Sequence, residues 1–273
     1  MPDLRLFKNP SFLIGSILIG ILLMMMVISF FYTPADPNAM NIQARFALPG
    51  AGHILGTDNF GRDILSRIMK GSQIAFSVGF LTLVIGLVAG TLIGSIAGYY
   101  GGIVDEVLMK IIDIKMAFPG VLLALMLIAA FGTGINNTLL ALGLMAIPRF
   151  ARVIRSGYLQ YKEMDFVKAA RARGAGNLRI MYIHILPNLL SPLIVTSSLS
   201  FASAVLAEAG LSYLGLGVQP PDPSWGKMLN EAQAYIAEAP WYAVIPGILI
   251  TMMVLGFNLI GDGLRTVYDV KAD

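Results

Sequence analysis

The sequence predicts an all-α integral membrane protein that crosses the bilayer six times, with both termini in the cytoplasm. Three observations carry this prediction: apolar residues make up 56% of the 273 residues, charged residues make up only 13%, and the apolar residues gather in six stretches. A soluble domain carries about 25% charged residues, so this chain has too little polar surface to cover a water-facing shell. The same composition excludes a disordered chain. The lack of cysteine excludes disulfides and thiolate metal sites.

Each apolar stretch is measured against a bilayer core of about 30 Å, which a helix of about 20 residues crosses. The first stretch is charge-free, longer than the apolar core of a signal peptide and without a small-x-small cleavage site after it, so we expect a permanent anchor. The fourth is interrupted early by Pro148 and Arg149 and continues as a cytosolic helical extension. The predicted spans are Phe12–Tyr32, Ile74–Ala97, Ile111–Phe131, Thr138–Pro148, Leu189–Leu216 and Tyr242–Leu264.

The orientation of the spans follows from the basic residues in the connections, because cytoplasmic loops carry an excess of Lys and Arg. With the N-terminus inside, the inside segments hold 14 of the 19 basic residues. The outside segments then hold only Arg45, Arg62, Arg67, Lys70 and Lys227. The net charge of +3 is therefore explained by membrane topology rather than by binding to nucleic acid.

These spans divide the chain into three parts. Residues 1–73 form the N-terminal tail, the first span and an extracytoplasmic segment; residues 74–264 form a five-helix core with a cytoplasmic loop over 149–187; residues 265–273 form a C-terminal tail. Secondary transporters often carry two related halves, and this chain shows no internal repeat. It is predicted to be one half of an oligomeric transporter.

The sequence predicts no catalytic, cofactor or metal site in this chain. A phosphate-binding loop is absent, because Gly226-Lys227 is followed by Met228 and lacks the preceding glycine. The only histidines are His53 and His184, and neither is placed to serve a serine in Gly210-Leu211-Ser212. ATP would therefore have to be bound and hydrolysed by another subunit.

Two features lie inside the predicted spans. Glu208 is the one acidic residue well inside a span, where it would be either a proton site of an ion-coupled transporter or a hydrogen-bonded packing residue; we favour packing. Glycines also recur every four residues in the second span, which lets another backbone approach one helix face closely. They are Gly86, Gly90, Gly94 and Gly98, and packing within the chain is favoured over a subunit interface.

The outside segment around Gly56–Arg67 is dense in turn-forming and charged residues. We expect a helix over Gly61–Lys70, with Asp58 as its cap. Asp63 and Arg67 have the i,i+4 spacing of a surface ion pair. This helix would either lie on the membrane face or contact a partner protein, and the sequence leaves both open.

The inside loop begins with Arg149, Arg152 and Arg155, a row that is predicted to extend the fourth span into the cytosol. Pro187 marks the start of the fifth span. Between them, Asp165 begins a short helix over Phe166–Arg173, whose C-terminal end can be formed by the glycines that follow. The small residues of this region are Ala169, Ala170, Ala172, Gly174 and Gly176. They would let another protein come close, which favours a docking element over a solvated basic loop.

At this loop the sequence resembles the permease subunits of bacterial ABC importers. Their cytoplasmic signature is Glu-Ala-Ala, three residues, Gly, nine residues and Ile-x-Leu-Pro. The corresponding residues are Lys168-Ala169-Ala170, then Gly174, then His184-Ile185-Leu186-Pro187. Lys168 replaces the acid and His184 the first isoleucine, but the spacing is intact. The resemblance implies that ATPase subunits dock here.

Longer motifs are similar to one branch of these permeases. Gly56-Thr57-Asp58, Gly61-Arg62-Asp63 and Ser66-Arg67 resemble the outside motif of the dipeptide/oligopeptide/nickel family. Similarity to its second, C-type permease is carried by Glu208–Gly217, Gln219-Pro220-Pro221, Pro223-Ser224-Trp225-Gly226, Ala239-Pro240-Trp241, Phe257-Asn258-Leu259, Gly261-Asp262 and Leu264-Arg265.

The resemblance implies the membrane domain of a type I importer in the bacterial inner membrane. The chain would pair with a B-type permease, two ATPase subunits that bind ATP and Mg²⁺, and an extracytoplasmic solute-binding protein. Peptides are the favoured solute, with nickel or a metal-chelate or opine solute as the alternative. The alternative from another class is an ion-coupled secondary transporter that uses Glu208.

Overall fold

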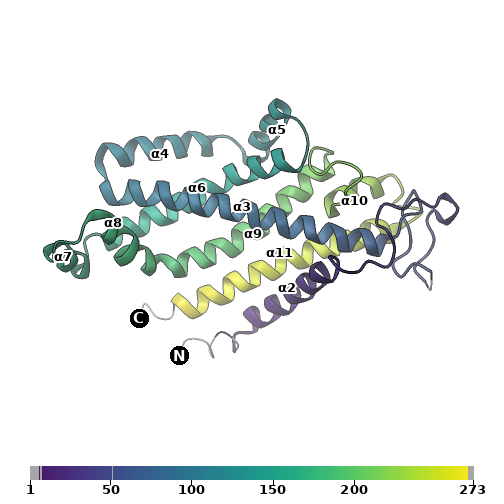
Figure 1. The fold of residues 1–273 in the computed structure, drawn as a ribbon, viewed down its shortest axis with the longest axis horizontal. Coiled ribbons are helices and arrows are strands. Elements are labelled where there is room, and N and C mark those ends of the chain that lie inside the picture. The colour runs from purple at the N-terminus through teal and green to yellow at the C-terminus, as the bar shows by residue number, and fades with distance from the viewer. Residues whose placement is uncertain (1–5, 7, 51, 270–273) are drawn as a thin grey trace.

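The computed structural model describes residue 6 and residues 8–50 and 52–269, and every regular element in this part of the chain is a helix (Figure 1). The long helices run along one direction and pack side by side. The main helices are α2 (Pro10–Ile28), α3 (Ile64–Tyr100), α4 (Gly102–Ala117), α5 (Gly120–Phe131), α6 (Ile135–Tyr161), α7 (Asp165–Ala172), α8 (Asn177–Arg179), α9 (Leu190–Tyr213), α10 (Trp225–Gln233) and α11 (Pro240–Asp269). Short 3-10 and π segments, η1 (Ile42–Ala44), η2 (Ile180–Ile185) and η3 (Leu186–Leu189), complete them.

The bundle has two distinct ends, which we call the α7 end and the α10 end after the short helices there (Figure 1). Five helical stretches are long and apolar enough to span a membrane, and a sixth is counted if the bent pair α4–α5 is one span. The beginning of α2 and the last turns of α11 both lie toward the α7 end, as an even number of crossings requires. The prediction of an all-α, multi-pass fold is confirmed.

The glycines of the second span lie against α6. A Cβ atom on Gly90 would meet the Cβ of Phe150 at 2.5 Å and the carbonyl oxygen of Ile147 at 2.8 Å. The same row continues at Gly86, Gly94 and Gly98, each of which faces α6. Packing within the chain, the favoured interpretation, is therefore what the structure has. Because glycine has no side chain, the backbones of α3 and α6 can approach each other closely along this row.

The third predicted span, 111–131, is not a single straight helix. It is divided into α4 and α5, whose axes meet at 88°. The break lies at Phe118 and Pro119, where Phe118 is extended, with φ −86° and ψ 131°. Proline disfavours the helical conformation of the residue before it and has no N–H for the helix ladder. Pro148, in contrast, lies inside α6, which continues to Tyr161 as the predicted extension requires.

The fifth predicted span begins earlier than expected. Helical backbone starts at Asn177 and runs through the π-helical and 3-10 turns η2 and η3 into α9. His184 and Pro187 therefore lie within this helical stretch, which begins before the predicted start of the span at Leu189. Proline is tolerated because it lies in the first turn of η3, where its missing N–H has no partner to lose.

The helix predicted over Gly61–Lys70 is not a separate surface helix. It is the first part of α3, which begins at Ile64 and continues into the bundle. Ile64 and Ile68 are buried against Met228 and Tyr242 from α10 and α11. The predicted domain boundaries after residues 73 and 264 also fall inside helices, α3 and α11.

Candidate functional site

Helix α7 is a short helix whose two ends are both stabilised. Asp165 lies in its first turn, where a carboxylate is favoured by the helix dipole. At the other end Gly174 has φ +83°, its N–H donates to Arg171 O at 2.9 Å, and the Ala175 N–H donates to Ala170 O at 3.1 Å. This is a Schellman motif, which needs a left-handed residue that glycine supplies without strain. Gly176 instead has φ −70° and precedes α8.

Most of α7 is exposed. Val167 is its one buried residue and packs into a cluster at the α7 end that includes Tyr158 and Ile180. The small side chains at Ala169 and Ala172 face outward, and a Cβ added at Gly174 or Gly176 would meet nothing within 4 Å. The outer surface of α7 is therefore open, while Val167 and the Phe166 ring, 6.4 Å from the Tyr161 ring, hold the helix to the bundle. Lys168 reaches only Asp165, at 3.7 Å in the open, which contributes little.

Two tyrosines tie this loop to the long helices. The Tyr158 hydroxyl of α6 donates to Met181 O at 2.8 Å, and the Tyr99 hydroxyl of α3 donates to Asn177 Oδ1 at 2.8 Å. Tyr158 is fully buried. These contacts connect the loop that carries α7 to α3, α6 and the α8–α9 stretch. Sequence reasoning missed both tyrosines, since nothing in the local pattern pairs them with residues 23 and 78 positions away.

The basic row on α6 divides into paired and unpaired members. Arg155 donates to both oxygens of Asp105 at 2.5 and 2.6 Å, and Arg152 donates to Asp113 at 2.7 Å, so both bind α6 to α4. Arg149 has no ion pair or hydrogen bond within the described part of the chain. Its neighbours along α6 pack on Gly90, inside the predicted second span. Of the three arginines in the row, Arg149 lies nearest the middle of α6, and its side chain is exposed.

The outside motif forms a buried charge cluster at the α10 end. Arg62 donates to Asp58 Oδ2 at 2.6 Å and to Glu231 Oε2 at 2.8 Å. Arg67 donates to the same Glu231 oxygen at 3.2 Å, and the Tyr242 hydroxyl donates to it at 2.8 Å. Asp58 and Arg67 are both 0% exposed. We call Asp58, Arg62, Arg67, Glu231 and Tyr242 the α10-end cluster.

Within this region the local prediction was wrong on two points. Asp63, not Asp58, caps α3, since its carboxylate accepts from the Ser66 N–H at 2.8 Å. Asp63 also contacts His53 Nδ1 at 2.9 Å and forms no surface ion pair with Arg67, which is buried and pairs with Glu231. The Asp58 carboxylate instead stabilises the turn that precedes α3, because it accepts a hydrogen bond of 2.9 Å from the N–H of Arg62.

Two glycines of the outside motif are needed for the backbone conformation there. Gly56 has φ +77° and Gly61 has φ +71°, a conformation that L side chains rarely adopt. A side chain at Gly61 would also collide with Asn41 O. The pKa of the neighbouring Lys227 ammonium is lowered, mainly by burial. Glu231 opposes this decrease, whereas Arg67 and Arg62 add to it. The motif therefore fixes the segment before α3 onto α3 and α10, and its charges face inward.

Glu208 lies in α9 and is 2% exposed. Its Oε1 accepts from the Ser212 hydroxyl at 2.6 Å, and the Ser224 hydroxyl is a second hydrogen-bond partner. The Ser212 oxygen in turn accepts from the Val218 N–H at 3.1 Å. Glu208 therefore joins α9 to the segment that leads into α10. This is the geometry of a hydrogen-bonded packing residue.

Comparison with known proteins gives a consistent result. Residues 90–272 match the model of the family described as "Binding-protein-dependent transport system inner membrane component". The chain is 42% identical over 267 residues to the dipeptide transport system permease protein DppC of Alkalihalophilus pseudofirmus, covering 98% of this chain and 88% of the relative. It is 43% identical over 223 residues to the glutathione transport system permease protein GsiD of Pectobacterium atrosepticum, covering 82% and 74%.

A solved structure resembles the fold. The membrane chain of the MetNI methionine ABC transporter in an inward-facing conformation superposes with a TM-score of 0.57 at 21% identity, covering 76% of this chain and 95% of that one. At this identity the likeness supports the fold of the helical bundle and nothing finer.

Proposed function

This chain belongs to the binding-protein-dependent transport system inner membrane component family, the permease subunits of ABC importers, and from that premise we propose that it forms half of the translocation path for short peptides. The observation that carries this proposal is the identity of about 40% over nearly the whole chain to permeases named for dipeptides. The glutathione permease, named for another short peptide, is as similar over most of the chain. No observation favours the ion-coupled alternative, and Glu208 is explained by its serine partners.

The partners follow from the same proposal. A B-type permease would complete the path, an extracytoplasmic solute-binding protein would deliver the peptide, and two ATPase subunits would bind ATP and Mg²⁺. The α7 end is the cytoplasmic end in this account, because the basic residues of the loop and of the α6 row gather there. The α10 end then faces the binding protein.

We further propose that α7 is the element on which an ATPase subunit docks. Its exposed small residues allow a close approach, and Val167 anchors it in the cluster around Tyr158. The bond from Tyr158 to Met181 passes a displacement of α7 to the helices that enclose the path. Asp165, Lys168, Ala169, Ala170 and Gly174 would form the contact surface, with Gly176, His184 and Pro187 on the arm behind it.

The α10-end cluster has a supporting role in this account. Its charges satisfy one another inside the protein, so they are not available to a partner. We propose that they hold the segment before α3 rigid, and that the surface of this segment is what a binding protein would contact. The motif would thus affect transport through the shape of that surface.

The function is tested by reconstituting the complete importer in liposomes with its binding protein. Uptake of a radiolabelled dipeptide should require both ATP and the binding protein. Accumulation of nickel or a metal chelate but no dipeptide would contradict the proposed substrate. Dipeptide accumulation driven by an ion gradient without ATP would contradict the importer assignment.

A further inference from the structure

Arg149 lies deeper in the membrane domain than its neighbours in the basic row. The backbone of α6 beside it, at Ile147 and Ala151, packs on Gly90. Gly90 is seven residues before Ala97, the end of the predicted second span, which places Arg149 about 10 Å inside that end at 1.5 Å per residue. The Arg149 side chain is exposed on the surface of this chain. Ionisable side chains inside spans commonly face a water-filled cavity and mark the pathways of substrates or ions.

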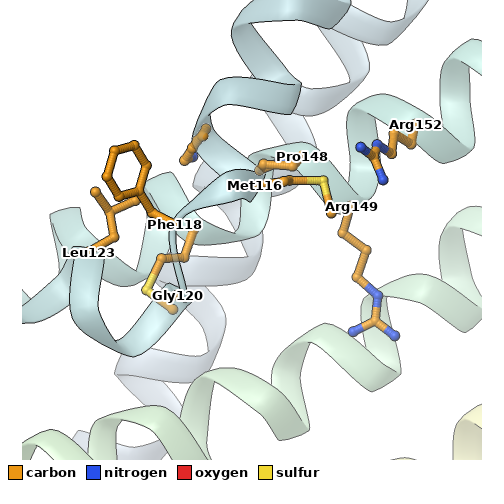
Figure 2. A pocket seen from close by; sticks show the side chains of 9 residues that line it. Met116, Phe118, Gly120, Leu123, Pro148, Arg149 and Arg152 are labelled. Atoms are coloured by element: carbon orange, nitrogen blue, oxygen red, sulfur yellow. The ribbon is translucent and has the colours of Figure 1, made fainter.

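Two cavities meet at Arg149. The larger, of about 520 Å³, lies where α4 bends into α5, and its wall includes Lys115, Phe118 and Arg152. The smaller, of about 130 Å³, lies between α3, α6 and α9. Met145 and Arg149 line both. Figure 2 shows the Arg149 side chain directed away from Phe118 and Leu123, toward the green ribbon of α9.

The smaller cavity contains polar groups that have no partner. The hydroxyls of Thr82 and Ser200 line it and make no hydrogen bond within the described part of the chain. Thr82 is only 3% exposed and Ser200 only 6%. Buried hydroxyls are normally hydrogen-bonded, so two unpartnered ones in one cavity need an explanation. Both hydroxyls are free to donate to an acceptor in this cavity, which Arg149 also lines.

The charge and shape of the two cavities define the ligand. Neither cavity has Asp or Glu among its lining residues, and the larger one is also lined by Lys115 and by Arg152, whose charge is paired with Asp113. Its remaining wall is mainly apolar, with Met116, Phe118 and Leu123. A ligand with a carboxylate at one end and an apolar body at the other satisfies both. Guanidinium and carboxylate form strong, charge-assisted hydrogen bonds.

We infer that Arg149, with Thr82 and Ser200, binds the C-terminal carboxylate of a peptide during its passage, and that the larger cavity takes the adjoining side chain. This inference rests on the proposed function, because it concerns the path of that same substrate. An anionic lipid headgroup has similar chemistry. Headgroups, however, lie outside the hydrocarbon core, whereas the backbone of Arg149 lies about 10 Å inside the predicted end of the second span.

The test uses the complete importer reconstituted with its binding protein. Arg149→Gln removes the charge and leaves a shorter, polar side chain at an exposed position, so the protein should insert and assemble normally. Dipeptide uptake should fall about tenfold or more, since a hydrogen bond to a charged group is lost. ATP hydrolysis stimulated by the loaded binding protein should be retained. Arg149→Lys should recover most of the uptake, and Lys110→Gln, which removes an exposed cation on α4, should leave uptake unchanged.

Two further arms separate the explanations. Thr82→Val and Ser200→Ala should each lower uptake by a few fold without lowering ATP hydrolysis. The Arg149→Gln defect should be the same in vesicles of phosphatidylcholine alone and in vesicles that contain phosphatidylglycerol. A defect seen only with phosphatidylglycerol would identify a lipid ligand and overturn the inference. Full uptake by Arg149→Gln would also overturn it, whereas absence of dipeptide uptake by the wild type would overturn the proposed function itself.

Discussion

The hydroxyl of Tyr158 donates a hydrogen bond of 2.8 Å to the carbonyl oxygen of Met181, and this bond joins α6 to the helical stretch that follows α7. Both residues belong to the buried cluster that receives Val167 from α7. One polar bond and one apolar cluster therefore connect α7 to two long helices. We expect the region around Tyr158 to carry motion from the α7 end into the bundle.

Tyr158→Phe should weaken this link while the fold is kept. The loss of one buried hydrogen bond costs about 1 kcal/mol, with a further cost for an unsatisfied carbonyl. We expect a small decrease in melting temperature and fewer peptides imported per ATP hydrolysed. Tyr161→Phe is the matched control, because Tyr161 lies on the same helix and is only partly buried. Equal transport stoichiometry in the two variants would show that the bond to Met181 has no role in coupling.

The orientation can be tested because the chain has no cysteine. Asn136→Cys and Asp222→Cys place a thiol on exposed positions at the α10 end, and Gln160→Cys places one toward the α7 end. An impermeant maleimide added to intact cells should label the first two variants and not the third. Labelling of Gln160→Cys before the membrane is permeabilised would reverse the assigned orientation.

Arg67→Met should destabilise the protein strongly. It removes a fully buried cation that shares Glu231 with Arg62, and breaking a buried ion pair costs about 3–5 kcal/mol. The melting temperature of the detergent-purified complex should fall by several degrees or more. Lys110→Met removes an exposed pair with Glu106, worth about 0.3–0.5 kcal/mol, and should change little. A melting temperature for Arg67→Met equal to that of the control would mean that the α10-end cluster does not hold the fold.

Gly90→Ala tests the contact between α3 and α6. The added methyl group would meet Phe150 Cβ at 2.5 Å, and overpacking of this kind costs about 1–3 kcal/mol. Gly20→Ala on α2 is the control, since its Cβ would meet nothing within 4 Å. Alanine also favours helix over glycine by about 0.5–1 kcal/mol. Gly20→Ala should therefore be neutral or stabilising, and a stabilising Gly90→Ala would contradict the observed packing.

The sequence predicted those features that depend on local pattern. Apolar length located the spans, the four-residue spacing of glycines located a close helix contact, and Gly174 located the end of α7. The bend at Phe118–Pro119 was missed because the stretch 111–131, in spite of Asp113 and Lys115, is apolar enough to be interpreted as one span. That proline, just before α5, was the available signal.

The rest could not be predicted because it depends on distant residues. Arg62 and its partner Glu231 are 169 positions apart, so no local pattern relates them, and the i,i+4 spacing of Asp63 and Arg67 indicated the wrong pair. The depth of Arg149 depends on its register against α3, which only the packing of the glycine row defines. The hydrogen bond from Tyr158 to Met181 has the same cause, since it forms only when the chain returns after α7.

The central claim is that α7 is the surface through which ATP hydrolysis drives transport, and Ala169→Trp tests it most directly. Ala169 is exposed on α7, so a large side chain there adds bulk without disturbing the fold. ATP hydrolysis and dipeptide uptake should be measured together in the reconstituted importer, with and without loaded binding protein. Lys110→Trp, at an exposed position on α4, is the control. We predict that Ala169→Trp assembles in the membrane at normal levels and loses both stimulated hydrolysis and uptake, while Lys110→Trp keeps both. Full stimulation and full uptake by Ala169→Trp would contradict the account.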